Sequence, residues 1–278
     1  MRRLSAIVAG ALVLFCLSLR AVAQDKPGAR PASPLMRPAL ALGEELEYRV
    51  SYSFFTIGTI RLKVTDRTES AGRVMYRAEI FMDSNPSLSW LADVHIRFYG
   101  SMDSEAFSYN WVSDDSSASG VEFRTMEFDY PKGRMYYARG RRPPGGTNTI
   151  TARDTLAIRD RSQDGMSLLF FAREHAHDVR PWRIPTFVDN REAITQIKYL
   201  GRRESVEIDA VPYPVHTIYF DGTANFVGVF GLTGGFEGWF SNDEARIPII
   251  GRMKVILGSV KVELTKWKRG AWSPPRGR

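Results

Sequence analysis

The residues best suited by type to bind a metal ion are two histidines that lie close together in the sequence. His175 and His177 are two positions apart, so an extended segment would direct both imidazoles to one side, and imidazole is a common ligand of divalent cations. A third ligand cannot be placed by spacing, because His95 and His216 are far away in the sequence. We therefore expect a solvated loop here and no metal site.

Candidate nucleophiles lack the sequence context that hydrolysis requires. There is no Gly-x-Ser-x-Gly motif, and Ser167 follows Asp164 by one helical turn, which suits a hydrogen bond at a helix start better than nucleophilic attack. The glycines at 145–146 lack the preceding strand and following helix of a phosphate-binding loop. We therefore predict no catalytic residues, no enzymatic activity and no cofactor, although paired glycosidase carboxylates are recognised only from their separation in space.

Aromatic side chains indicate a site that binds without reacting. If the strands curve, rings on the concave face would line a pocket for a lipid-like or other apolar ligand. A glycine-rich apolar stretch at 226–236 would form a loop over such a ligand or an interface, or else a glycine-bent strand in the core. The predicted ligand-binding residues are Tyr48, Tyr52, Trp90 and Trp111 from the strands, and Phe226, Phe230 and Phe236 from the glycine-rich stretch.

The first 23 residues have the pattern of a cleavable signal peptide. Two arginines precede an uncharged run from Leu4 to Leu19, which is shorter than a spanning helix, and the sequence Ala-Val-Ala then ends at Ala23. We expect cleavage after Ala23 and export to the periplasm, with no transmembrane helix left; an uncleaved anchor is the alternative. Cleavage removes three arginines and Cys16, so the net charge falls from +7 to +4 and no thiol remains.

The rest of the chain divides into a linker, one large domain and a basic tail. Residues 24–41 are rich in proline and alanine and form the linker, residues 42–267 carry the strand signals, and residues 268–278 are the tail. In the first strand Leu46, Tyr48 and Val50 alternate with charged residues, and this period of two recurs along the domain. Short connections indicate an antiparallel arrangement of about a dozen strands.

One helix interrupts this pattern. Asp164 can cap a helix that runs to His175 and is apolar over much of its circumference, so it is expected to be buried. A single turn is also expected at Pro86–Leu91. We therefore predict an all-β fold in which a curved antiparallel sheet, or half-barrel, packs around one buried helix; a two-sheet β-sandwich is the alternative.

Three segments resemble an exported bacterial family, the domain of unknown function 3108. They are residues 43–60, residues 164–173 and residues 238–248, and the motif positions are Gly58, Asp164, Ser167, Arg173 and Trp239. The likeness spans about residues 43 to 266, and it implies an exported β domain but no reaction. The last segment is also similar, at the level of fold alone, to the β-sheet proteins that carry lipoproteins in the periplasm.

Three classes of function remain open. The first is non-catalytic binding of an apolar, lipid-like ligand in the cupped sheet, and the second is a protein–protein interaction module of the cell envelope that uses a sheet edge or the 226–236 stretch. A hydrolase of unrecognised type is the third. A nucleic-acid partner is not expected in this compartment, and a hollow or filled interior would distinguish the first two classes.

Overall fold

A computed structural model describes residues 39–277, except 71, 89–92, 225–233 and 255–257. The fold below is that of the compact unit Arg37–Arg278. None of the helices in the described ranges has the length and apolar character needed to cross a bilayer. Trp90, Phe226 and Phe230 lie outside the described residues.

The strands form because apolar and polar residues alternate along them. In β1 Leu46, Tyr48 and Val50 are buried and the residues between them are half-buried, while Tyr52 at the end of the strand is exposed. The first eight strands are β1 (Glu45–Tyr52), β2 (Phe55–Ser70), β3 (Arg73–Ser84), β4 (His95–Asp103), β5 (Ser108–Ser117), β6 (Gly120–Asp129), β7 (Arg134–Arg142) and β8 (Thr149–Ala157). A short 3-10 helix, η1 (Pro86–Leu88), lies in the connection between β3 and β4, where the sequence predicts a turn.

Six further strands follow the single α-helix, α1 (Ser167–Glu174). They are β9 (Pro181–Val188), β10 (Arg191–Val206), β11 (Val215–Ala224), β12 (Gly234–Ser241), β13 (Pro248–Lys254) and β14 (Ser259–Lys268). All fourteen belong to one antiparallel sheet in the order β8-β7-β6-β5-β4-β3-β2-β1-β14-β13-β12-β11-β10-β9. The sheet is continuous from β8 to β9, so the predicted curved sheet is confirmed over the two-sheet sandwich.

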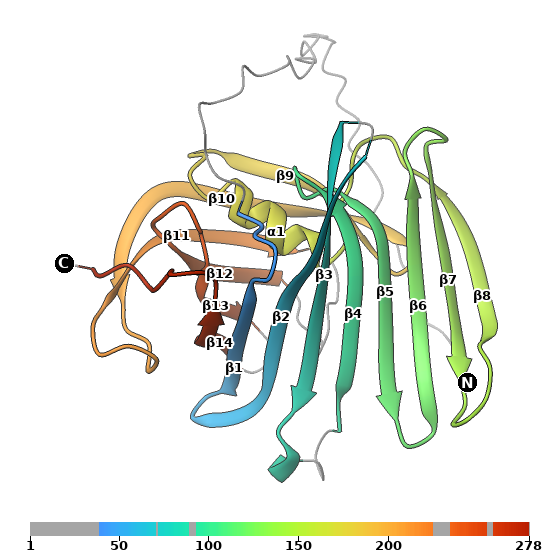
Figure 1. Cartoon of the computed structure of the whole chain (residues 1–278), viewed down its shortest axis with the longest axis horizontal. Helices are drawn as coiled ribbons and strands as arrows, with labels where there is room; N and C mark the ends of the chain where they lie inside the picture. Colours follow the sequence, from blue (N-terminus) through green and yellow to red (C-terminus); the bar gives the residue numbers. More distant parts are fainter. Residues whose placement is uncertain (1–38, 71, 89–92, 225–233, 255–257, 278) are drawn as a thin grey trace, which may run out of the picture. The chain divides into compact units, whose positions relative to one another are not determined.

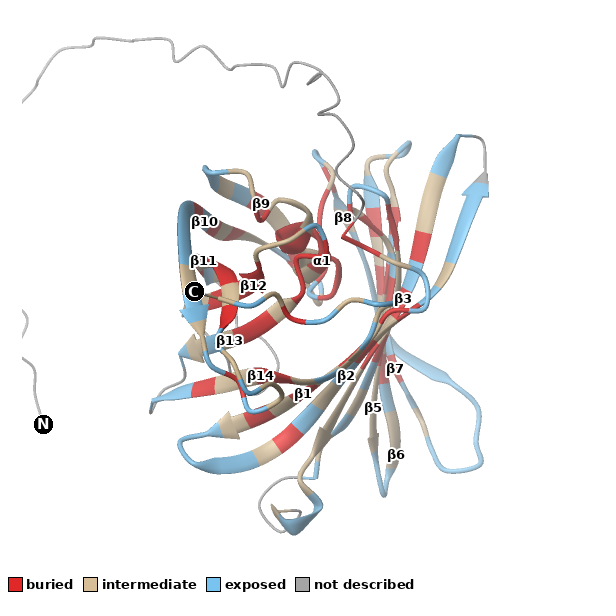
Figure 2. Cartoon of the chain, turned by 60° about the vertical axis from the view of Figure 1, so that its left-hand side comes forward, coloured by how far each residue is buried: buried red, intermediate tan, exposed pale blue. Residues whose placement is uncertain are grey.

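The concave side of the sheet is filled by α1 and by side chains from both halves of the sheet. Figures 1 and 2 show α1 inside the curve, between the strands β9–β13 and the strands β2 and β3. A Cβ at Gly100 of β4 would lie 2.1 Å from the Met166 methyl group, so sheet and helix segment are in direct contact. One apolar cluster connects the strands to the helix, and its members include Leu62, Met126, Met135, Phe170, Phe187, Ile197 and Phe240.

Candidate functional site

The three segments that carry the family resemblance meet at the C-terminal end of α1. Arg173 is fully buried and donates from Nη1 to Glu44 Oε1 at 2.7 Å and from Nη2 to Glu44 Oε2 at 3.0 Å. Its guanidinium also donates to the backbone carbonyl oxygens of Ala39, Ala245 and Arg246, at 3.1, 3.2 and 3.2 Å. Arg173 therefore ties the start of the domain to the loop between β12 and β13.

Three more charged residues complete this cluster. Arg269 donates to the Ala39 carbonyl at 2.7 Å and to the Glu44 carboxylate, and Glu174 accepts from the Ala39 N–H at 2.8 Å. Arg246, which is itself buried, pairs with Glu174 at 3.3 Å. We call Glu44, Arg173, Glu174, Arg246 and Arg269 the α1 clamp. Each of its three arginines is paired with a carboxylate, as a buried ionic network requires.

Burial and pairing act in opposite directions on the ionisation of the α1 clamp. Burial disfavours the charge on Arg173, but the neighbouring Glu44 carboxylate raises the pKa of Arg173 above its ordinary value. For Arg246, burial is the larger effect and lowers the pKa. Tyr48 lies beside Arg173 and Glu44. Burial and the Glu44 charge raise the pKa of Tyr48, although the Arg173 charge opposes the change. A tyrosine whose pKa is raised holds its proton, so it is a poor base.

The start of α1 is fixed by Asp164 and Ser167. One Asp164 oxygen, Oδ1, accepts from the N–H groups of Met166 and Ser167, at 2.6 and 3.0 Å, and the other accepts from the Ser108 hydroxyl at 2.5 Å. In return, the Ser167 hydroxyl accepts from the Asp164 N–H at 2.9 Å. The helix begins at Ser167, but Asp164 caps the turn before it as the spacing predicts. Ser167 is thus a structural hydroxyl.

The other motif positions also pack the fold. Gly58 has no room for a side chain, because a Cβ there would lie 2.5 Å from the Asp83 carbonyl oxygen on β3. The buried Trp239 ring donates from Nε1 to Glu204 Oε2 at 2.7 Å and contacts the Tyr219 ring. The motif positions are therefore explained by chain packing.

The predicted ligand-binding aromatics are distributed over three environments. Tyr48 and Trp111 are buried in the apolar cluster, where Trp111 stacks on Phe98. Phe236 is half-buried on β12, and a Cβ at Gly222 of the neighbouring strand would nearly touch its ring. Tyr52 is exposed at the end of β1. The structure does not bring these four side chains together around one hollow.

His175 and His177 lie just after α1, as the sequence predicts, but they are partly buried. The His175 ring lies 4.2 Å from the rings of Phe171 and Trp182, and its Nδ1 is 3.0 Å from Asp178 Oδ2. Burial lowers the pKa of both histidines, and the Asp178 carboxylate partly offsets the effect at His175. The expected solvated loop is therefore a packed corner at the end of the helix.

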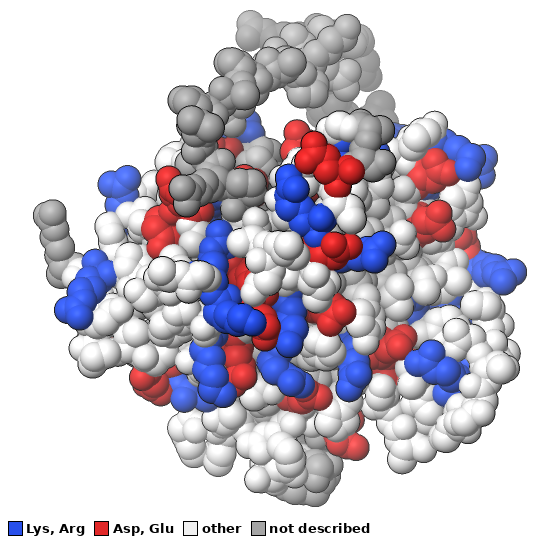
Figure 3. Space-filling view, in the orientation of Figure 1, with Lys and Arg blue, Asp and Glu red and all other residues white. Residues whose placement is uncertain are grey.

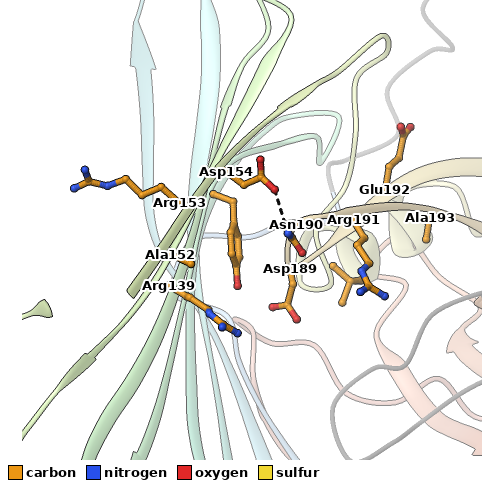
Figure 4. Close-up of a pocket in the computed structure, with 11 residues that line it drawn as sticks. Arg139, Ala152, Arg153, Asp154, Asp189, Asn190, Arg191, Glu192 and Ala193 are labelled. Carbon is orange, nitrogen blue, oxygen red and sulfur yellow. Dashed lines mark hydrogen bonds between the residues drawn. The ribbon is translucent and has the colours of Figure 1, made fainter. Parts of the chain in front are cut away.

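A cleft of about 720 Å³ lies where the two edges of the sheet approach each other without pairing. Its walls come from β7 and β8 on one side and from the β9–β10 hairpin on the other, and we call this region the seam. Across the seam Asn190 Nδ2 donates to Asp154 Oδ2 at 3.1 Å, as Figure 4 shows, and Asp189 pairs with Arg124 at 3.3 Å. The lining residues are Tyr137, Arg139, Ala152, Arg153, Asp154, Val188, Asp189, Asn190, Arg191, Glu192 and Ala193.

One end of the seam is closed by the chain that leaves β8. Gln163 forms a parallel bridge with Thr186 of β9, in which the Gln163 N–H donates to the Pro185 carbonyl and the Phe187 N–H donates to the Gln163 carbonyl. The edge of β9 is thus partly covered, whereas β8 pairs only with β7 among the named strands. The seam therefore combines an available strand edge with a polar cleft.

Charge in the seam and over the surface is mixed. The cleft lining contains arginines and acidic residues from both walls, and Figure 3 shows both signs interspersed on the face that it presents. The cleft therefore presents ionic and hydrogen-bonding groups of both signs.

The fold and these sites define a class of β-barrel-like proteins whose single curved sheet does not close. The chain belongs to the family described as "Protein of unknown function (DUF3108)", whose sequence profile matches residues 47–265. No curated protein matches the sequence. A similar solved structure is that of a β-barrel-like protein of domain of unknown function DUF1849 from Brucella abortus, with 9% identity and a TM-score of 0.52 over 82% of this chain and 97% of that chain. At this identity the likeness shows the fold alone.

Sequence reasoning missed the α1 clamp and the seam. The signal for the clamp was an arginine at the end of an apolar helix, since Arg173 follows Phe170, Phe171 and Ala172, and a buried arginine needs an acidic partner. The identity of that partner depends on the fold, because Glu44 lies 129 positions away. The seam has no comparable signal, since it depends on how far the sheet curls.

Proposed function

We propose that this chain is a non-catalytic interaction protein of the bacterial envelope that binds an extended segment of a partner protein in the seam. The observation that carries the proposal is the open edge of β8 beside a polar cleft of about 720 Å³. A segment that pairs with β8 would extend the sheet by one strand, with main-chain hydrogen bonds providing affinity. The mixed charges of the cleft would determine which side chains the bound segment can carry.

Backbone groups of β8 are available for such pairing. The Ile158 N–H, just after β8, donates to the Gly133 carbonyl just before β7 at 3.0 Å. Because N–H groups alternate along an edge strand, the N–H groups of Thr155 and Arg153 face away from β7, and that of Thr155 donates to the Asp154 side chain at 2.8 Å. Arg153 lines the cleft, although its guanidinium end points away from the other labelled residues in Figure 4. Comparing Arg153→Pro with Arg153→Ala therefore isolates the backbone N–H of residue 153, because both variants lack the arginine side chain.

Binding of a lipid-like ligand in the cup has less support. The region that such a ligand would occupy is filled by α1 and by the apolar cluster, and Tyr48 and Trp111 belong to that cluster. The cleft that the structure offers is lined largely by charged and polar residues. Native mass spectrometry of the exported protein tests this alternative, and a stoichiometric lipid in the spectrum would favour it.

The envelope location is part of the proposal and is supported by residues 1–23. Their pattern is that of a cleaved signal peptide. N-terminal sequencing of the protein from the periplasmic fraction should give Gln24 as the first residue. A product that begins at Met1 in the cytosolic fraction would contradict this part.

The decisive experiment places a photo-crosslinking amino acid at Thr151 on β8 and identifies the linked peptide in cells. We expect the probe to crosslink to one segment of a partner protein. The crosslink should be lost in Arg153→Pro, which removes an N–H group from the edge of β8, and retained in Arg153→Ala, which keeps that N–H group. Thermal melting of both variants checks that they fold. Equal crosslinking in the proline and alanine variants, with both folded, would reject strand addition at β8.

A further inference from the structure

One hairpin presents aromatic side chains to solvent that the fold does not use. The turn between β1 and β2 consists of Ser53 and Phe54, and Phe55 opens β2. Phe54 is 83% exposed and Phe55 is 55% exposed, and their ring centroids are 4.2 Å apart. We call Phe54 and Phe55 the aromatic tip. Within the described ranges, the large aromatic side chains classed as exposed are these two and Tyr52 at the base of the same turn.

The backbone of this turn indicates that the fold alone would favour other residues. Ser53 has a φ of +53°, a conformation that glycine, asparagine and aspartate adopt at lower cost. Two-residue hairpins are most often built with Asn-Gly or a related pair. A serine and a phenylalanine therefore make a strained turn with an apolar residue at its apex. Neither ring of the aromatic tip belongs to the apolar cluster of the core or packs against it.

The aromatic tip is convex, and this limits what it can bind. It stands at the end of a hairpin at the lower end of the sheet, where Figure 1 shows the β1–β2 turn projecting and Figure 2 shows it as exposed. A small ligand requires a hollow, which a protruding turn does not provide. Aromatic rings at a protruding turn can instead insert into a fluid phase that has a polar surface and an apolar interior. The interface of a phospholipid bilayer is such a medium.

Charge beside the tip fits the headgroups of an anionic bilayer. The hairpin of β13 and β14 is the neighbour of β1, since Tyr52 is opposite Val260. It carries Lys254, which is exposed and has no acidic partner among the described residues, at the same end of the sheet. Lys261, which lies opposite Ser51 near the base of the same turn, pairs with Glu263. A cation near inserted rings would contact lipid phosphates.

We infer that the aromatic tip inserts into the surface of a phospholipid bilayer that contains anionic lipid, and so docks the domain on a membrane. The inserted residues are Phe54 and Phe55, and Lys254 contacts the headgroups. This inference is independent of the proposed partner at the seam, because the tip is on β1 and β2 and the seam is at the edge strands β8 and β9. If an experiment rejects one of these two proposals, the other is unaffected.

The test is vesicle binding by the chain that begins at Gln24, which retains the whole compact unit Arg37–Arg278. Sedimentation is measured with vesicles of phosphatidylethanolamine and phosphatidylglycerol. The double variant Phe54→Ser with Phe55→Ser should bind these vesicles at least about tenfold more weakly, because it removes the apolar area that inserts. The matched control is Ile150→Ser with Leu200→Ser, which removes two exposed apolar side chains elsewhere and should bind as the unaltered chain does.

Two further measurements separate insertion from other causes. In the variant Phe54→Trp, tryptophan emission should shift to shorter wavelength when vesicles are added and should be quenched by brominated acyl chains. Lys254→Gln should weaken binding to vesicles with phosphatidylglycerol and leave the weaker binding to phosphatidylcholine vesicles unchanged. The inference is overturned if the unaltered chain does not sediment with vesicles, if the two double variants bind alike, or if the emission of Phe54→Trp stays unchanged.

Discussion

The α1 clamp and the seam are both built from arginines and carboxylates, but they place these charges in opposite environments. In the clamp, Arg173 and Glu44 are fully buried, and their hydrogen bonds are made within the domain. In the seam, Asn190 and Asp154 meet in an exposed hydrogen bond beside an open cleft. The centre of the clamp is closed off from solvent, whereas Arg153, Asp154 and Asn190 of the seam are exposed.

This contrast explains what the family resemblance can and cannot tell us. Asp164, Ser167 and Arg173, which help carry the resemblance, fix the two ends of α1, and Gly58 and Trp239 pack neighbouring strands. None of these five lines the seam. The shared motifs therefore report how the domain folds, and the position of a binding site has to be read from the structure.

The largest expected effect comes from breaking the α1 clamp. Arg173→Met should lower the free energy of unfolding by about 3–5 kcal/mol, because it leaves the Glu44 carboxylate buried with a weaker set of partners and removes donors to three carbonyls. Urea unfolding followed by circular dichroism measures the change. Partner crosslinking at the seam should be lost only to the extent that the protein is unfolded.

The control for this variant is the pair Arg173→Met with Glu44→Gln. Removing the Glu44 charge should recover part of the loss, because a neutral amide is less costly to bury than a carboxylate that has lost one of its two arginine partners. A single variant that is as stable as the unaltered chain would contradict the view that the clamp holds the start of the domain against the β12–β13 loop.

The elements near the clamp could be predicted from sequence where the determinants are local. The alternation of Leu46, Tyr48 and Val50 identifies β1, and the spacing of Asp164 and Ser167 identifies the start of the helix. Both depend on residues within one element. The fold class follows from such elements, because short connections leave antiparallel pairing as the simple arrangement.

The candidate sites were not predictable in the same way. Period-two alternation shows that Tyr48 and Trp111 turn inward, but it does not distinguish a packed core from a cavity. That difference depends on α1, whose position inside the curve is a long-range property. The aromatic tip shows that alternation can also fail to predict burial. Phe54 continues the apolar alternation of β1 in the sequence, but the strand ends at Tyr52, so Phe54 lies exposed at the apex of the turn.

An intermediate effect is expected from the histidines at the end of α1. Burial holds the pKa values of His175 and His177 below the ordinary value near 6.5, so below that pH the unfolded chain binds more protons than the folded one. Stability should therefore fall as the pH decreases from 6.5 towards the folded-state pKa values, by at most about 1.4 kcal/mol per pH unit for each histidine. Urea unfolding at a series of pH values measures this slope.

The histidine slope has to be separated from that of other buried groups. Burial raises the pKa of Asp164, which gives the opposite sign, because the folded chain then binds the extra proton above pH 3.8. The variants His175→Gln and His177→Gln remove only the histidine contribution, so each should flatten the slope below pH 6.5. An unchanged slope in both variants would show that neither histidine is linked to folding.

The smallest effect on stability is expected at the seam. Asn190→Ala removes the exposed hydrogen bond to Asp154 and should change the free energy of unfolding by less than about 0.5 kcal/mol, since water replaces it. Its effect should be local, with faster amide exchange in Thr149–Ala157 and in the β9–β10 hairpin and unchanged exchange in β1 and β14, measured by hydrogen–deuterium exchange. A loss of unfolding free energy as large as that of Arg173→Met would show that the seam, like the clamp, is needed for folding. An edge that must stay closed for folding would not be available to a partner.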